Sequence, residues 1–104
     1  MTLEDLQSKV QNTDSVMLYF SGENCGVCKV LQPKIKDAFN ENFPQIEQIY
    51  IDAQSNPKIS AQFGVLSLPT IIVYFEGKEF FKKSRLISLP ETIQILNRPY
   101  SLFY

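Results

Sequence analysis

The sequence predicts an α/β fold in which one mixed four-stranded sheet carries helices on both faces. Residues 16–20 form a continuous apolar run, which is typical of a strand buried on both faces of a sheet. From Gly26 the apolar residues recur at helical spacing, and two further segments rich in strand-forming apolar residues follow at 46–51 and 70–75. A right-handed strand–helix–strand unit followed by a β-hairpin joins such elements into one mixed sheet.

Length and charge bound the classes of protein to consider. With 104 residues, of which 44% are hydrophobic, we expect a single domain over residues 1–104. Ten Lys and Arg stand against 11 Asp and Glu, and this balance argues against a nucleic-acid partner or a polybasic membrane-surface protein. The chain has no His, which excludes zinc sites of the Cys/His type. We expect neither a metal nor an organic cofactor.

The sequence also carries signals about location. No apolar run approaches the ~20 residues that a membrane-spanning helix needs. The N-terminus is acidic and amphipathic, and it lacks the basic start and apolar segment of a secretory signal. We therefore expect a cytoplasmic protein. In such a chain its two cysteines, Cys25 and Cys28, are more often reactive than structural.

Eight elements follow one another with short connections. In order, we predict a helix over 2–11, a strand over 16–20, a helix from Gly26 that contains Pro33 and ends at Pro44, a strand over 46–51, a helix that begins at Pro57, a strand over 70–75, an edge strand over 79–84 and a helix from Ser88 through Leu96.

Residues at the helix starts support this placement. Thr2 with Asp5, and Ser88 with Glu91, have the spacing of capping boxes, in which two side chains bond the free N–H groups of a first turn. Pro57 suits a first helical position, because its missing N–H would have no partner there.

Turn residues mark the other boundaries. Gly64 is well placed to cap the short helix that begins at Pro57. Residues 76–78 read Glu-Gly-Lys and predict a hairpin turn. The lysines of the strand over 79–84 would discourage pairing with another chain at an exposed edge.

Cys25 and Cys28 lie at the junction of the buried strand and the long helix. A helix start offers unpaired N–H groups and partial positive charge, which stabilise a thiolate at Cys25 and lower its pKa below about 8.5. Cys28 lies one turn further on, and this spacing allows the Cα separation of roughly 4.4–6.8 Å that a disulfide requires. Gly26 places a small residue between the two sulfurs.

A C-x-x-C pair between a strand and a helix favours redox chemistry over its alternatives. One alternative is two small cysteines in an intracellular core. The other is half of a zinc site, which needs a second pair of ligands from another copy of the chain.

Residues 19–29, with Pro33 downstream, resemble the active-site region of thioredoxins, and Leu68-Pro69-Thr70 resembles the cis-proline loop of that family. The resemblance covers residues 14–97, and the combined motifs are highly specific. It implies a thioredoxin-like fold that lacks the family's usual first strand, because the chain begins at the first helix.

The resemblance implies a role for each matching residue. Cys25 is the attacking thiol and Cys28 the resolving thiol. Pro69 follows a cis peptide bond beside the disulfide, and Leu68 offers its backbone to an extended substrate. Gly26 and Val27 complete the substrate-binding residues. The alternative for Pro69 is a trans proline that only starts a strand.

Five positions depart from the family pattern, and they bear on the potential, the rate and the choice of partner. Asn24 stands where the family usually has Trp, Val27 where it has Pro, Tyr19 where it has a buried Asp, Gln48 near the place of a Lys, and Arg85 where it has Gly.

We therefore expect a monomeric thiol–disulfide oxidoreductase that reduces protein disulfides through Cys25 and Cys28 and receives electrons from a separate reductase. The alternatives are a dedicated oxidant or isomerase on the same fold, and a non-enzymatic interaction module that uses the aromatic tail at 98–104. We expect that tail to pack on an apolar edge of its own domain.

Overall fold

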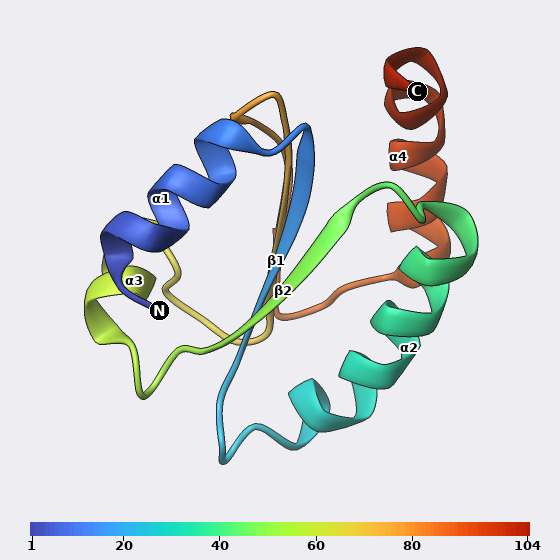
Figure 1. Ribbon diagram of the computed structural model, residues 1–104. Coiled ribbons are helices and arrows are strands. Elements are labelled where there is room, and N and C mark those ends of the chain that lie inside the picture. The colour runs from blue at the N-terminus through green and yellow to red at the C-terminus, as the bar shows by residue number, and fades with distance from the viewer.

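The computed structural model describes all 104 residues. Its elements are α1 (Leu3–Asn12), β1 (Ser15–Ser21), α2 (Gly26–Asn42), β2 (Glu47–Asp52), α3 (Pro57–Gln62), β3 (Thr70–Phe75), β4 (Lys78–Ser84) and α4 (Leu89–Phe103). Figure 1 shows the sheet between two pairs of helices, with α1 and α3 on one side and α2 and α4 on the other. The predicted order of helices and strands is confirmed.

The sheet has the strand order β2-β1-β3-β4. Strand β1 pairs with β2 in parallel and with β3 antiparallel, and the hairpin partner β4 lies antiparallel to β3 at an edge. The predicted mixed sheet and the edge position of its last strand are therefore confirmed. Parallel pairing of β1 and β2 brings the carboxyl end of β1 next to that of β2, which is where the loop to Cys25 begins.

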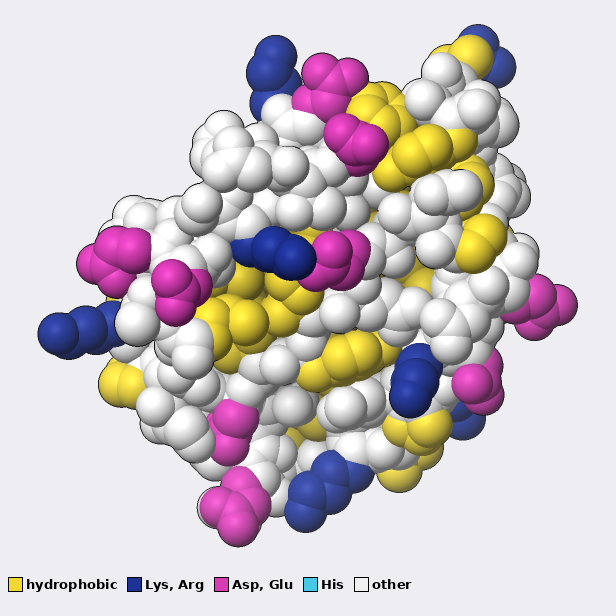
Figure 2. All heavy atoms as spheres, in the orientation of Figure 1, with side chains coloured by type: hydrophobic (Ala, Val, Ile, Leu, Met, Phe, Trp, Pro, Cys, Tyr) yellow, Lys and Arg dark blue, Asp and Glu magenta, His cyan; other side chains and the backbone are white.

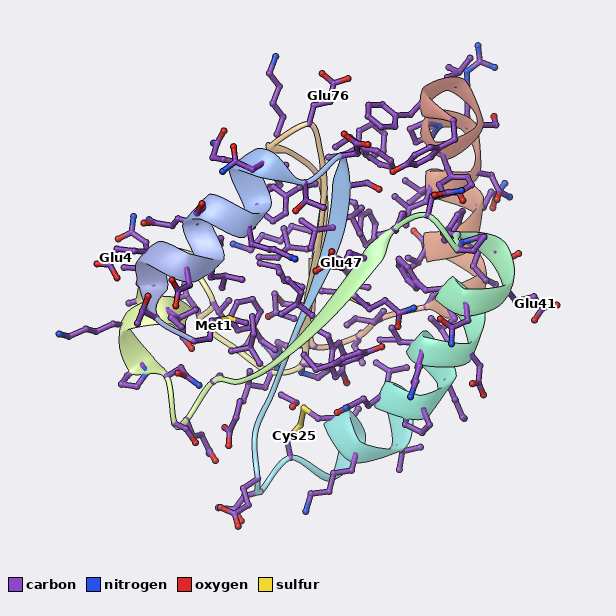
Figure 3. All side chains as sticks on the ribbon, in the orientation of Figure 1. Met1, Glu4, Cys25, Glu41, Glu47 and Glu76 are labelled. Atoms are coloured by element: carbon purple, nitrogen blue, oxygen red, sulfur yellow. A yellow bond between two sulfur atoms is a disulfide. The ribbon has the colours of Figure 1, made fainter.

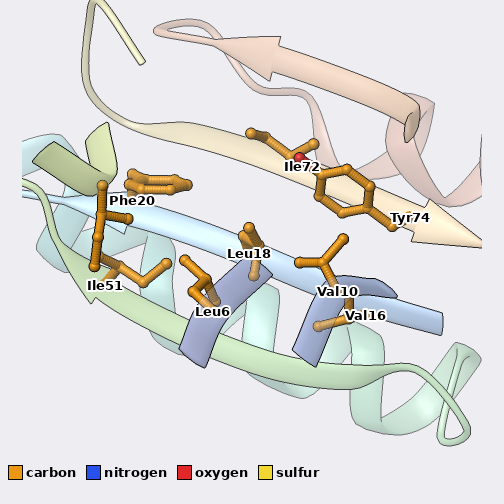
Figure 4. Packing of buried hydrophobic residues seen from close by; sticks show 9 residues of the cluster. Leu6, Val10, Val16, Leu18, Phe20, Ile51, Ile72 and Tyr74 are labelled. Carbon is orange, nitrogen blue, oxygen red and sulfur yellow. The ribbon is translucent and has the colours of Figure 1, made fainter. Parts of the chain in front are cut away.

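Two hydrophobic cores lie on the two faces of the sheet, and β1 contributes to both. Leu18 and Phe20 point toward α1 and α3, whereas Met17 and Tyr19 point toward α2 and α4. Figure 4 shows Leu6 of α1 packed among the side chains of the first core. Because successive side chains of a strand alternate between faces, an unbroken apolar run is what a central strand with helices on both sides requires.

The predicted capping box is complete at α1, whereas only its Ser88 half forms at α4. Thr2 and Asp5 form a complete capping box, because each side chain accepts from the backbone N–H of the other residue. At α4 the Ser88 hydroxyl accepts from the Glu91 N–H at 3.3 Å, but the Glu91 carboxylate makes no bond in return. The prediction of a second capping box is therefore correct for Ser88 alone.

Glycines in the left-handed region end α3 and form the hairpin. Gly64 has φ +68°, and its N–H and that of Val65 bond carbonyls in the last turn of α3, as in a Schellman motif. The hairpin turn consists of Glu76 and Gly77, both with positive φ, as in a type I′ turn. Lys78 already belongs to β4, so the predicted three-residue turn was one residue too long.

The last helix is longer than the sequence indicates, because α4 continues through Pro99 to Phe103. Its final turn packs on the sheet and on the end of α2. The ring centroids of Tyr100 and Phe43 lie 5.1 Å apart, and those of Phe103 and Phe75 lie 5.5 Å apart. The Tyr104 hydroxyl bonds the Ser15 hydroxyl. The expectation that the aromatic tail packs on its own chain is confirmed.

The surface view agrees with the mixed composition. Figure 2 shows Lys and Arg side chains interspersed with Asp and Glu on this face, and hydrophobic side chains gathered near the C-terminal end of α4. None of the helices combines the length and the apolar character that crossing a membrane would demand.

Buried tyrosines predict a loss of stability at alkaline pH. Burial raises the pKa of Tyr74 and of Tyr19 to about 12, above the value of about 10 in the unfolded chain. Above pH 10 the unfolded state therefore holds fewer protons than the folded state, so the free energy of unfolding should decrease as the pH rises toward 12. Urea unfolding at pH 8 to 11.5 measures this decrease.

Tyr74→Phe should make the decrease shallower, because the raised pKa of Tyr74 accounts for part of it. An equal slope in wild type and Tyr74→Phe would contradict the assignment.

Candidate active site

Cys25 and Cys28 form a disulfide at the N-terminal end of α2, with a Cα–Cα distance of 5.2 Å. Figure 3 shows Cys25 at this end of the molecule, away from the labelled Glu41, Glu47 and Glu76. The expected Cα separation is therefore confirmed, and the two cysteines are not separate core thiols. The structure holds no group of three or more His, Cys, Asp or Glu side chains that could bind a metal ion.

Cys25 is the N-cap residue of α2, with φ −100° and ψ 95°. Its sulfur accepts from the Cys28 N–H at 3.2 Å, and its own N–H bonds the Gly22 carbonyl at 3.1 Å. A side chain at this position replaces one of the missing partners of the first helical turn. The same donors and the positive end of the helix dipole would stabilise a thiolate on Cys25 after reduction.

The two sulfurs differ in access. Cys25 is partly exposed, whereas Cys28 is completely buried under the first turn of α2. A disulfide of another protein can therefore approach Cys25 and not Cys28.

Tyr19 lies beneath the dithiol and is completely buried. Its hydroxyl donates to the Cys28 carbonyl at 2.9 Å, so it ties β1 to the first turn of α2. Burial raises the pKa of Tyr19 to about 12, with a smaller contribution from Tyr50, whose ring lies 5.8 Å away. At neutral pH this phenol is protonated and cannot take a proton from the Cys28 thiol.

A chain of neutral polar groups extends from this site across β2. Tyr50 donates from its hydroxyl to the Gln48 amide oxygen, and the Gln48 amide nitrogen donates to Asn40 at 2.7 Å. The sequence singled out Tyr19 and Gln48 as departures from the family pattern. The structure places both among neutral groups, where the family usually has a carboxylate and a lysine, and Tyr19 meets the hydrogen-bonded chain only through its ring contact with Tyr50.

The peptide bond between Leu68 and Pro69 is cis, which confirms the expected geometry of this loop. One groove with a volume of about 790 Å³ brings together all the predicted site residues except the buried Cys28. Its lining consists of Cys25, Gly26, Val27, Leu68, Pro69, Lys83, Ser84, Arg85 and Leu86.

The last four of these residues come from the end of β4 and the loop to α4. Of these four residues, the sequence singled out only Arg85, because the family usually has Gly at its position. That departure could also have pointed to Lys83, Ser84 and Leu86 beside it. The Arg85 N–H donates to the Pro69 carbonyl at 2.8 Å, which holds this loop against the cis-proline loop. Arg85 has φ +69°, a conformation that costs a residue other than glycine about 1–2 kcal/mol.

Exposed apolar side chains border the dithiol. Val27 is 62% exposed and Leu86 is 85% exposed, and both line the groove. Val30, on the next turn of α2, is also exposed and adds to an apolar hollow that begins at Val27. Apolar surface of this kind, rimmed by polar groups, is typical of interaction sites.

Other charged side chains near the strand ends have structural partners. The Asp52 carboxylate accepts from Ser55 and from the Gln54 N–H, and these bonds lower its pKa. Glu47 pairs with Lys9 at 2.9 Å. These contacts give Glu47 and Asp52 structural roles at the two ends of β2.

A disulfide at a helix start, facing a cis-proline loop on this sheet, is the arrangement of thiol–disulfide oxidoreductases. The thioredoxin family model matches residues 1–95, so the chain belongs to the thioredoxin family. Family membership and the Cys25–Cys28 pair together support thiol–disulfide oxidoreductase activity.

Curated relatives cover most of the chain. It is 24% identical over 102 residues to the thioredoxin-like protein YdfQ of Bacillus subtilis (strain 168), covering 98% of this chain and 90% of that protein. It is 30% identical over 83 residues to the thioredoxin of Chlamydia muridarum, covering 80% of each.

Solved structures support the fold. Thioredoxin 1 from Thermosipho africanus TCF52B superposes with a TM-score of 0.76 at 30% identity, covering 84% of this chain and 96% of that one. Oxidised mitochondrial thioredoxin 3 from Saccharomyces cerevisiae gives 0.75 at 20% identity, covering 96% and 89%. The predicted thioredoxin-like fold is confirmed.

Proposed function

We propose that this protein reduces disulfides in other proteins through Cys25 and Cys28. The observation that carries the proposal is the unequal access of the two sulfurs, with Cys25 open to the groove and Cys28 buried behind it. In the reduced protein the Cys25 thiolate attacks one sulfur of a substrate disulfide. A mixed disulfide forms, and the other substrate sulfur leaves as a thiolate.

Cys28 completes the reaction. Its thiolate attacks the Cys25 sulfur, releases the second substrate thiol and forms the disulfide seen in the structure. In total, two electrons pass from the Cys25–Cys28 dithiol to the substrate disulfide by thiol–disulfide exchange. No cofactor is needed for this exchange, but a separate reductase must restore the dithiol.

The groove supplies the substrate contacts. An extended segment beside the substrate disulfide can pair with the backbone of Leu68, next to Pro69, in the way that a strand adds to an exposed edge. Gly26 leaves room for this approach, because no atom lies within 4 Å of the place that a side chain would take. Val27 offers apolar surface on the helix side.

The direction of electron flow can be tested by the potential of the Cys25–Cys28 couple. A reductant should equilibrate with glutathione buffers near −270 mV, about the value of thioredoxin, whereas an oxidant should lie nearer −120 mV, about the value of DsbA. The reduced protein should also accelerate insulin precipitation by dithiothreitol.

The Cys25→Ser variant serves as the inactive control in the insulin assay. A potential near −120 mV would favour the alternative of a dedicated oxidant. Failure to accelerate insulin reduction would favour a binding module.

A further inference from the structure

We propose that Lys83 and Arg85 make the groove selective for substrate proteins that carry Asp or Glu beside their reactive disulfide. The inference rests on the proposed function, because it names the substrates of the same site. It assigns the selectivity to the β4 side of the groove, opposite Val27 and α2.

The first observation is that both cations are free. Lys83 and Arg85 line the groove, and neither side chain makes a hydrogen bond or a salt bridge within the chain. The single salt bridge of the structure joins Lys9 and Glu47, far along the sequence from these residues. No Asp or Glu lines the groove, so its charged residues are of one sign.

The neighbouring lysine shows the contrast. Lys82 directly precedes Lys83 on β4, and its ammonium group donates to the carbonyls of Phe63 and Gly64, at 3.1 and 3.0 Å. It therefore helps to hold the end of α3. Strand alternation sends Lys83 to the opposite face, where it lines the groove and has no such partner.

The second observation is the backbone of Arg85. Its φ of +69° lies in the region that favours glycine, and the thioredoxin pattern has Gly at this position. The Arg85 N–H bond to Pro69 explains why the loop holds this conformation, but it would be equally available to glycine. The exposed guanidinium makes no hydrogen bond or salt bridge within the chain, which leaves it free to bind a group on another molecule.

Carboxylates suit these two cations. A guanidinium can bind a carboxylate through two parallel N–H bonds, which a lysine cannot do. Val27 and Leu86 give the groove apolar walls, and a bound peptide would exclude water from the pair and strengthen it. Glu23 and Lys29, which flank the dithiol, are both exposed and of opposite sign, so they do not change this preference.

Two disulfide peptides of identical length test the proposal, one with Asp on each side of its reactive cysteine and one with Asn. Stopped-flow measurement should show that the reduced wild-type protein reduces the Asp peptide about five- to tenfold faster at low salt. The difference should narrow at high salt, because screening weakens exposed charge pairs.

Matched variants separate the groove cations from total charge. In the double variant Lys83→Gln/Arg85→Asn the ratio of the two rates should fall to about one, and Asn is chosen because it tolerates a left-handed backbone. Lys78→Gln removes a lysine from the far end of β4 and should keep the wild-type ratio.

Equal rates for the two peptides in wild type would overturn the proposal and leave the proposed function intact. A ratio that survives in the double variant would also overturn it. Reduction of neither peptide would remove the proposed function, and the inference with it.

Discussion

Replacing Cys25 by Ser is expected to reduce turnover to the uncatalysed rate, whereas replacing Cys28 by Ser is expected to stop the reaction at a mixed disulfide. The two outcomes differ because Cys25 lies open at the start of α2 and Cys28 is buried one turn behind it. Without Cys28 no sulfur is in place to attack the Cys25–substrate bond, so the covalent complex accumulates. Intact-mass measurement under non-reducing conditions detects it.

The double variant Cys25→Ser/Cys28→Ser is the control, and it should form no covalent complex with any substrate. Limiting iodoacetamide should label Cys25 first in the reduced wild-type protein, because its thiolate is accessible and stabilised by the helix start. Preferential labelling of Cys28 would reverse the two roles.

In the wild-type protein, resolution of the mixed disulfide is expected to become about tenfold faster with each pH unit between pH 6 and 8. The reason is that Cys28 must ionise before it attacks, and a buried thiol is mostly protonated at neutral pH. Tyr19 cannot remove that proton, because its pKa is raised to about 12 and its hydroxyl donates to the Cys28 carbonyl. Rapid-quench kinetics on the isolated mixed disulfide measure the rate.

Tyr19→Asp should accelerate resolution at pH 7 and flatten the pH profile, at a cost in stability from the buried carboxyl group. Tyr19→Phe is the matched control, because it removes the hydroxyl and introduces no base. It should keep the wild-type pH dependence and lose about 1 kcal/mol of stability with the hydrogen bond. Equal rates for wild type and Tyr19→Asp across pH 6 to 9 would show that this position takes no part in proton transfer.

The parts of the fold that the sequence predicts are those that local patterns determine. The run over 16–20 is typical of a strand with both faces covered, and Thr2 and Asp5 indicate the start of α1 by their spacing. The Cys25–Cys28 site and the cis peptide bond before Pro69 were predicted through motifs whose residues are close together in the chain.

The parts that were missed depend on contacts between distant segments. Pro99 reads locally as the end of a helix, but α4 continues past it because Tyr100 and Phe103 pack on Phe43 and Phe75. The hydrogen bond from Tyr19 to Cys28 requires the relative position of β1 and α2. No local pattern encodes either contact, so neither could be read from the sequence.

Strand β1 contributes side chains to both hydrophobic cores. Unfolding of the helices on one side of the sheet is therefore coupled to unfolding of those on the other. Leu18 and Phe20 pack in one core, and Met17 and Tyr19 pack in the other. All four are consecutive residues of the same seven-residue strand. Loosening α1 would therefore weaken the platform on which α2 holds the dithiol, although α1 lies on the opposite face. The rigidity of the Cys25–Cys28 site therefore depends on packing on both faces of the sheet.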